Sequence, residues 1–413
     1  MMLLLVGCFG EGKDAVSSGV TDRPDTIVDT DPTTDDTDTS EEDSGATLTD
    51  VDALVEALRV DRDGTLLEVS RETGWPAPVD GGWLFVSTLG SAYGLAGDHG
   101  GWTPEPMTQE DDFSWLVRPA EPGGGYKYTD GADWTADPWG RAYRYDEFGE
   151  LSLIPDPTVG HLERQFRVGG QGLDARTLHL WVPGGGHTHT LYMMDGQNLF
   201  DPNAFYGGWQ VDHVVPAGML VVGIDNTPAR AEEYTHVEDY IYGAWYGGDA
   251  ATYADYLRED VRPVIAAAYG EEGTVGLLGS SLGGLVSFVI ADLQPGEYAF
   301  AGSMSGTMGW GSIGANNPTI IEIYADAGHR DTALYLDSGG EGDCFDGDGD
   351  GIDDDDPSSG DNYCENLQLR DVLADAGYTF DVDLWHWWEP GAEHNEAAWA
   401  ARVDRPLGLF AGL

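Results

Sequence analysis

The chain has 413 residues, 41% of them hydrophobic, and a formal net charge of −55 at pH 7. This length predicts about two or three domains, and the apolar content is ample for a large core. The strong negative charge excludes nucleic acid as a partner, because its phosphates would be repelled. We interpret the charge as a soluble acidic surface.

The first eight residues are apolar and end in a cysteine. Leu5-Val6-Gly7-Cys8 resembles the bacterial lipobox, in which the cysteine is lipidated after cleavage, although the segment is too short for a full signal peptide. The alternative is a short apolar terminus without function. Residues 9–46 are rich in Asp, Thr, Ser and Gly, which predicts a disordered acidic linker. We expect an exported protein of the bacterial cell envelope, attached to a membrane only through Cys8, or a secreted one.

Residues 47–157 predict a small immunoglobulin-like β-sandwich that follows a short helix. Strand-like segments alternate there with Gly, Pro and Asp clusters, at 66–69, 82–88, 114–118, 125–129 and 141–145. Residues 95–102 (Leu-Ala-Gly-Asp-His-Gly-Gly-Trp), 125–128 (Gly-Tyr-Lys-Tyr) and 137–139 (Asp-Pro-Trp) resemble the early-set sandwich of glycogen-binding modules. The resemblance implies that Trp102, Trp134 and Lys127 contact a glycan, or else pack inside the sandwich.

Residues 158–413 alternate between strands and helices, which predicts an α/β domain with a doubly wound, mostly parallel sheet. The expected strands are 177–182, 190–194, 219–224, 274–278, 299–304, 333–336 and 380–385, and the expected helices are 253–268, 282–292 and 366–376. Right-handed crossovers place the carboxyl ends of all parallel strands on one edge of the sheet. The functional site is therefore expected on that edge.

Two loops on this edge carry candidate binding groups. After the second strand, the backbone N–H of Gly196 or Gln197 is the expected partner of the Leu282 N–H in an oxyanion hole; the alternative is an ordinary Asp-Gly turn. The expected substrate cleft has four side chains: Asp195, Asn226, Arg230 and Trp310. Asn226 and Arg230 follow the third strand. They could equally hold a loop in place through an Arg–carboxylate pair.

The strand at 274–278 leads into Gly279-Ser280-Ser281-Leu282-Gly283, which is followed by a helix. Strand, tight turn and helix are the setting of a G-x-S-x-G nucleophile, whose hydroxyl projects above the sheet. By the spacing of the motif, the nucleophile is Ser281 and not Ser280. The alternative is a Gly/Ser-rich loop without chemistry.

In a hydrolase triad of this type, the acid and the base follow the serine in that order. Asp343, or alternatively Glu341, lies after the strand at 333–336, and Asp337 is disfavoured because it is still on the strand. His394 lies on a short Gly loop past the final strand, where the base is expected. A surface histidine that caps the following helix is the alternative.

An acidic insertion separates these candidates. Asp346-x-Asp348-x-Asp350-Gly351-Ile352-x-Asp354 matches the start of a Ca²⁺ loop, without the Glu at position twelve of an EF-hand. We expect a structural Ca²⁺ held by Asp346, Asp348, Asp350, Ile352 and Asp354, or else a solvated acidic loop. Cys344 and Cys364 bracket this insertion, and in an exported protein they predict a disulfide.

Four motifs of residues 158–413 together resemble one family. They are residues 192–200 (Tyr-Met-Met-Asp-Gly-Gln-Asn-Leu-Phe), 222–226 (Val-Gly-Ile-Asp-Asn), 279–284 and 391–396 (Gly-Ala-Glu-His-Asn-Glu), and they look like the putative esterase family of α/β-hydrolases, which includes enterochelin and feruloyl esterases. The resemblance implies hydrolysis of a small-molecule or glycan-linked carboxylic ester through an acyl-enzyme, with no cofactor for catalysis. An acyltransferase of the same fold and a glycan-binding lipoprotein with an inactive hydrolase scaffold are the alternatives.

Overall fold

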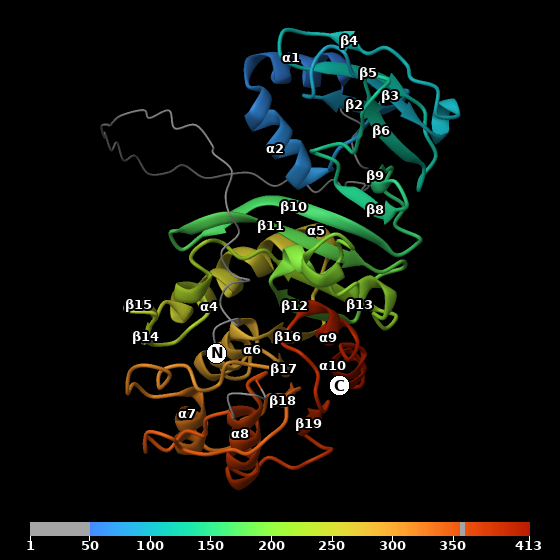
Figure 1. Ribbon diagram of the computed structural model, residues 1–413. Helices are drawn as coiled ribbons and strands as arrows, with labels where there is room; N and C mark the ends of the chain where they lie inside the picture. Colours follow the sequence, from blue (N-terminus) through green and yellow to red (C-terminus); the bar gives the residue numbers. More distant parts are fainter. Residues whose placement is uncertain (1–49, 356–359) are drawn as a thin grey trace, which may run out of the picture.

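The computed structural model describes residues 50–355 and 360–413 (Figure 1). Cys8 and the predicted linker at 9–46 lie outside the described residues. Within the described ranges, no helix combines the length and the hydropathy that a membrane span would require.

The described chain begins with two helices, α1 (Val51–Val60) and α2 (Arg62–Glu72). The predicted strand at 66–69 is wrong, because these residues lie in α2. The side chain of Asp61 caps this helix by accepting a hydrogen bond from the Gly64 N–H. Leu66 and Ser70, one helical turn apart, are buried on the same face.

Two antiparallel sheets follow the helices and pack face to face. One has the order β1 (Ala77–Val79), β2 (Gly82–Ser87), β5 (Ser114–Arg118) and β4 (Thr108–Gln109). The facing strands are β3 (Gly94–Gly97), β6 (Gly125–Thr129), β7 (Trp134–Thr135), β8 (Ala142–Asp146) and β9 (Gly149–Leu153). Phe85 and Tyr126 meet edge to face between them, with ring centroids 4.9 Å apart. This is the β unit that the sequence predicts at the N-terminal end.

A long hairpin links this unit to the rest of the molecule. It consists of β10 (His161–Gly170) and β11 (Leu173–Val182), and crosses the middle of Figure 1. β10 pairs with β8 on one side, and β11 pairs with β13 (Met219–Ile224) on the other. The second sheet of the N-terminal unit and the large sheet below it are therefore one continuous hydrogen-bonded sheet.

The six strands beyond the hairpin are parallel, in the order β19-β18-β17-β16-β12-β13. They are β12 (His189–Met194), β13, β16 (Thr274–Ser280), β17 (Phe300–Met304), β18 (Ala333–Ser338) and β19 (Leu384–Trp388). This confirms the predicted α/β class with a mostly parallel sheet. β19 begins later than the predicted 380–385, because Asp383 accepts a hydrogen bond from the Thr379 N–H and closes a turn there.

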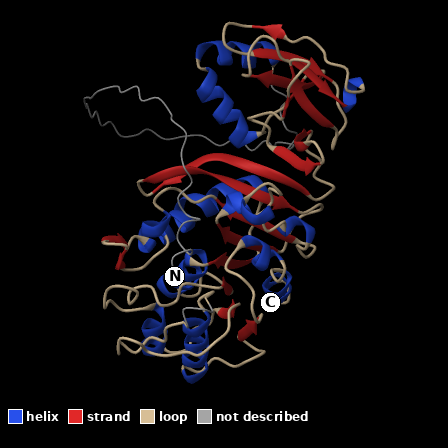
Figure 2. Ribbon diagram, viewed as in Figure 1, coloured by secondary structure: helices blue, strands red, loops and turns tan. Residues whose placement is uncertain are grey.

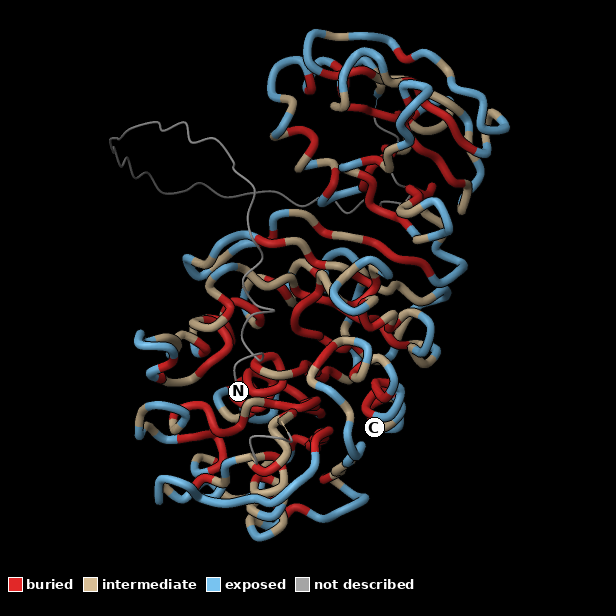
Figure 3. The backbone as a smooth tube through the Cα atoms, in the orientation of Figure 1, coloured by how far each residue is buried: buried red, intermediate tan, exposed pale blue. Residues whose placement is uncertain are grey.

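Helices cover both faces of the parallel sheet (Figure 2). One face carries α4 (Ala250–Tyr256), the π-helical turn Leu257–Val261, α5 (Arg262–Tyr269), α6 (Leu282–Leu293), α7 (Ile320–Ala327) and α8 (Tyr363–Asp375). The other carries α9 (Glu396–Ala400) and α10 (Asp404–Phe410). Tyr192 and Met194 point to the first face, and Leu191 and Met193 to the second. Both faces are thus buried, and Figure 3 shows the strands as the red centre of the domain.

Candidate active site

Ser281 lies between the end of β16 and the start of α6, in the strand–turn–helix setting that the sequence predicts. Its backbone has φ 55° and ψ −126°, a conformation that costs a non-glycine residue free energy and recurs at functional sites. Its N–H donates to the Met304 carbonyl at 3.0 Å, which ties the turn to β17. A Cβ at Gly279 would lie 2.4 Å from the Gly283 backbone, so only glycine allows this tight turn.

His394 precedes α9 and is paired with Asp361. His394 Nδ1 and Asp361 Oδ1 lie 2.8 Å apart, and the two side chains are 11% and 2% exposed. Because a carboxylate only accepts hydrogen bonds, the proton lies on Nδ1 and the lone pair on Nε2. This is the tautomer that a general base needs.

The expected partner of His394, Asp343 or Glu341, is therefore corrected to Asp361. Asp343 and Glu341 are both exposed, in the acidic insertion after β18. The chain returns to the sheet only at the far end of this insertion, where Asp361 lies two residues before α8. The pairing of Cys344 with Cys364, which the sequence predicts, was the available signal, because it brings the residues just before α8 back toward the end of β18.

The second oxygen of Asp361 is also satisfied. Its Oδ2 accepts hydrogen bonds from the Ser305 hydroxyl at 2.8 Å and from the Gly339 N–H. Ser305 Oγ in turn accepts from Arg402 Nη2 at 2.7 Å and from Trp399 Nε1 at 3.1 Å, so its own proton is directed at Asp361. The carboxylate is thus held rigidly with one oxygen free for His394.

A buried ion network lies behind this pair. Arg402, 2% exposed, donates from Nε to Asp337 Oδ1 at 3.0 Å, and its Nη2 lies 3.7 Å from Asp361 Oδ2. Burial raises the pKa of Asp337 to about 6, against the opposing effect of Arg402. Asp337 therefore lies behind the site as the partner of Arg402, which agrees with the expectation from the sequence that Asp337 is disfavoured as the triad acid.

Ser281 and His394 line the same cavity, which has a volume of about 360 Å³. Thr307 lies on the wall with its hydroxyl oxygen 3.5 Å from Ser281 Oγ, and Asn362 Nδ2 donates to this hydroxyl at 3.2 Å. A larger cavity of about 570 Å³ beside β19 contains neither Ser281 nor His394. The chemistry suggested by the sequence therefore belongs to the smaller cavity.

Of the three residues expected to form the oxyanion hole, one lies at the cavity. Leu282 follows Ser281, lines the cavity and begins α6. Gly196 and Gln197 follow β12, but they are not among the residues that line the cavity. Among the described residues, no hydrogen bond has the N–H of Leu282, Gly196 or Gln197 as its donor. These N–H groups therefore remain available to donate hydrogen bonds to a negatively charged oxygen.

The four expected cleft residues divide into two pairs. Arg230 and Trp310 line the cavity. Asp195 lies behind Arg230 and accepts two hydrogen bonds from its guanidinium, at 2.7 and 2.8 Å. Asn226 Nδ2 donates to the same carboxylate at 2.6 Å. Asp195 and Asn226 thus position Arg230 rather than form the wall.

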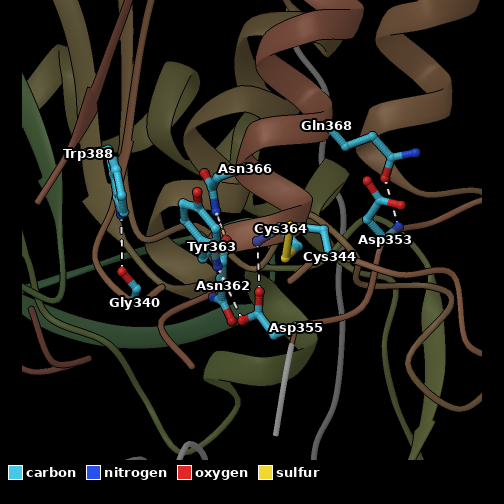
Figure 4. The surroundings of a disulfide bond; sticks show 10 residues. All are labelled: Gly340, Cys344, Asp353, Asp355, Asn362, Tyr363, Cys364, Asn366, Gln368 and Trp388. Atoms are coloured by element: carbon cyan, nitrogen blue, oxygen red, sulfur yellow. Dashed lines mark hydrogen bonds between the residues drawn. A yellow bond between two sulfur atoms is a disulfide. The ribbon is translucent and has the colours of Figure 1, made fainter. Parts of the chain in front are cut away.

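The insertion is closed by the predicted disulfide, Cys344–Cys364, which joins residues 20 positions apart (Figure 4). Asp355 accepts hydrogen bonds from the N–H groups of Tyr363 and Cys364 at the start of α8. Asp346, Asp348 and Asp350 have carboxylate oxygens within 4.8 Å of one another, a set that could hold a metal ion. The other two expected ligands differ: Ile352 is buried, and Asp354 Oδ2 accepts from the Gly347 N–H.

In the N-terminal unit, the three candidate sugar-binding residues are placed differently. Trp102 and Trp134 are 36% and 44% exposed, and their rings lie 6.1 Å apart. Lys127 is 5% exposed, and its ammonium donates to the Phe148 carbonyl at 2.9 Å. Lys127 therefore serves the packing of the sheet, whereas the two Trp rings lie at the surface.

The parallel sheet, the strained serine turn and the His–Asp pair at one cavity define this molecule as an α/β hydrolase. A model of the family described as Putative esterase matches residues 178–409, more than half of the chain. The chain belongs to this family.

Several solved structures are similar to this chain. An IroE-like serine hydrolase from Shewanella oneidensis shares 17% identity, with 60% of this chain and 80% of that chain covered and a TM-score of 0.48. The enterobactin esterase FES from Shigella flexneri shares 13%, covering 80% and 93%, with a TM-score of 0.45. The siderophore hydrolase EstA from Aspergillus nidulans shares 14%, covering 61% and 94%, with a TM-score of 0.45. No curated protein matches.

Proposed function

We propose that this protein is a serine carboxylic ester hydrolase that works through an acyl-enzyme. The observation that carries the proposal is the shared cavity of Ser281 and His394, with the Nδ1 proton of His394 held by buried Asp361. Membership of the esterase family supports the same reaction class.

The chemistry follows from these groups. Ser281 Oγ forms a bond to the ester carbonyl carbon while its proton passes to His394 Nε2, and the carbonyl electron pair moves onto oxygen. The N–H of Leu282, a residue that lines the cavity, stabilises that oxyanion. Collapse of the intermediate breaks the bond to the alcohol oxygen, which takes the proton from Nε2. Water then attacks the acyl-enzyme by the same steps and releases the acid and Ser281.

The experiment compares two adjacent serines. Ser281→Ala should lower kcat for p-nitrophenyl butyrate about 10³-fold or more, because the nucleophile is removed. Ser280→Ala, at the 4% exposed neighbour in the same turn, is the matched control and should keep activity. A Ser281→Ala protein that retains activity within tenfold would reject this assignment.

We propose in addition a structural Ca²⁺ in the acidic insertion, held by Asp346, Asp348 and Asp350. The nearness of their oxygens and the D-x-D-x-D-G pattern support it. Calorimetric titration with Ca²⁺ should show one site, and saturation should raise Tm, since a ligand bound only by the folded state stabilises it. Asp348→Asn should weaken both effects, and an unchanged Tm in excess Ca²⁺ would exclude the site.

We also propose export with a lipid anchor on Cys8. The lipobox-like Leu5–Cys8 sequence and the Asp- and Thr-rich residues 9–46 support it, as does the disulfide, which favours an oxidising compartment. Labelled palmitate should enter the wild-type protein in a bacterial host and not the Cys8→Ser variant. Equal labelling of both would contradict the anchor.

A further inference from the structure

One wall of the cavity above Ser281 is acidic. Asp353, Asp354 and Asp355 at the end of the insertion line it, together with Glu365 from the first turn of α8. Glu365 accepts hydrogen bonds from the N–H groups of Met308 and Gly309 at 3.0 and 2.7 Å. In the described part of the chain, the carboxylates of Asp354, Asp355 and Glu365 bond only backbone N–H groups, and none of the four forms an ion pair with Lys, Arg or His.

The positive charge on the wall does not offset them. Arg230 lines the cavity, but both oxygens of Asp195 bind its guanidinium, at 2.7 and 2.8 Å. His394 is bonded to the Asp361 carboxylate at 2.8 Å, so its ring also has an acidic partner of its own. Burial raises the pKa of both Glu365 and Asp355, and the nearby Asp355 adds to the rise at Glu365. An anionic group entering this cavity therefore meets carboxyl groups that already repel one another, in a protein whose net charge is −55.

Aromatic side chains line another part of the same cavity. Tyr240 and Tyr242 come from the hairpin of β14 (Glu238–Ile241) and β15 (Ala244–Gly247), and are 44% and 67% exposed. Trp310 is buried, with its indole N–H donated to the Val237 carbonyl. The faces of Trp and Tyr rings attract alkylammonium groups. Aromatic faces combined with carboxylates that lack a cationic partner are the complement of an organic cation.

We propose that the ester hydrolysed in this cavity carries a positive charge, as an alkylammonium group a few bonds from the scissile carbonyl. This substrate class rests on the proposed esterase function and on the position of the four carboxylates beside Ser281 and His394. The cation replaces bulk water as the partner of the carboxylates, three of which are already fixed by backbone N–H groups. The attraction orients the ester and adds nothing to the covalent steps.

The test uses p-nitrophenyl esters that differ only in charge. The cationic ester is the 4-(trimethylammonio)butanoate, its neutral isostere the 5,5-dimethylhexanoate, and its anionic counterpart the glutarate monoester. Each kcat/KM is divided by the rate of alkaline hydrolysis of the same ester, which removes differences in intrinsic reactivity. A second pair, butyrylcholine and 3,3-dimethylbutyl butyrate, places the charge on the alcohol side.

We expect the cation to be favoured over its isostere about tenfold in at least one pair, with the anionic ester poorest. The preference should shrink at high ionic strength, because the carboxylates and aromatic rings face a solvent-open cavity. Glu365→Gln and Asp355→Asn should each lower the ratio about threefold or more. Asp371→Asn, an exposed position on α8 outside the cavity, should leave it unchanged.

Binding to the Ser281→Ala variant separates this proposal from the proposed function. Calorimetry with butyrylcholine should show a site that Glu365→Gln weakens in the same background. Cation binding without turnover in the wild type would reject the esterase and keep the cation site. The opposite outcome is turnover of the esters, with kcat/KM for cation and isostere within twofold in both pairs and no binding of butyrylcholine. That outcome would keep the esterase and overturn the cation site.

Discussion

Replacing Asp361 by asparagine should abolish nearly all ester hydrolysis while the protein stays folded. The reason lies in the donors around the carboxylate. Oδ2 receives the Ser305 hydroxyl and the Gly339 N–H, and Ser305 cannot reverse its direction because Arg402 and Trp399 both donate to it. In the Asp361→Asn variant, the amide oxygen must therefore take the Oδ2 position, and the amide NH₂ group must face His394.

That arrangement imposes the wrong tautomer on His394. An NH₂ group 2.8 Å from Nδ1 requires Nδ1 to accept, so the proton moves to Nε2, and Nε2 can no longer take the proton of Ser281. In serine proteases, the equivalent change lowers kcat about 10⁴-fold. At about 1.4 kcal/mol for each factor of ten, this is a rise of about 5 kcal/mol in the barrier.

The assay is the kcat for p-nitrophenyl butyrate at pH 7, with circular dichroism and thermal unfolding to verify the fold. Asp343→Asn is the matched control, since Asp343 is exposed and lies in the same insertion, and it should keep activity within twofold. A folded Asp361→Asn protein with more than a tenth of wild-type activity would refute the role of Asp361. Loss of activity in Asp343→Asn with Asp361→Asn unaffected would restore the sequence-based choice.

Two further predictions concern buried charges. Arg402→Met should lower the free energy of unfolding by about 3–5 kcal/mol in urea, because it leaves Asp337 buried without its cation; a loss below about 1 kcal/mol would contradict the network. In the N-terminal unit, burial raises the pKa of Asp137 to about 6 from 3.8. Between about pH 6 and pH 4, Asp137 is therefore protonated in the folded state and ionised in the unfolded state. The free energy of unfolding should rise on acidification through this range by up to about 3 kcal/mol. Asp137→Asn should remove that increment from the pH profile measured by urea unfolding, and an identical slope in both proteins would exclude it.

The sequence predicts those parts of the site that short-range patterns encode. A buried strand, a G-x-S-x-G turn and an apolar helix place Ser281 without reference to the rest of the chain, since the steric demand at Gly279 is local. His394 follows from its position between the last strand and a capped helix. The parallel sheet follows from the alternation of strands and helices.

Asp361 could not be chosen in the same way, because its position depends on how the insertion folds back. Counting residues from the end of β18 favours Asp343, which is nearer in sequence and exposed in space. Likewise, residues 66–69 predict a strand but belong to the helix α2. Four residues are too few for the spacing of apolar side chains to distinguish a helix from a strand. The sheet is continuous because β8 pairs with β10. Local sequence patterns do not predict such a pairing between separate strands.

The return of the chain makes the disulfide part of the site. Asp361 is three residues before Cys364, whose partner Cys344 lies at the start of the insertion. Closing a loop of this length is worth about 3 kcal/mol in the chain-entropy account. The Cys344→Ser substitution, at the exposed end of the bond, should therefore lower the free energy of unfolding by about that amount. It should also lower kcat for p-nitrophenyl butyrate more than it raises KM, because it loosens the position of Asp361 and leaves the cavity wall at Trp310 intact. Thiol titration verifies the broken bond, and thermal unfolding with steady-state kinetics measures both effects. A variant that unfolds at a lower temperature but keeps the wild-type kcat would show that Ser305 and Gly339 fix Asp361 without help from the disulfide.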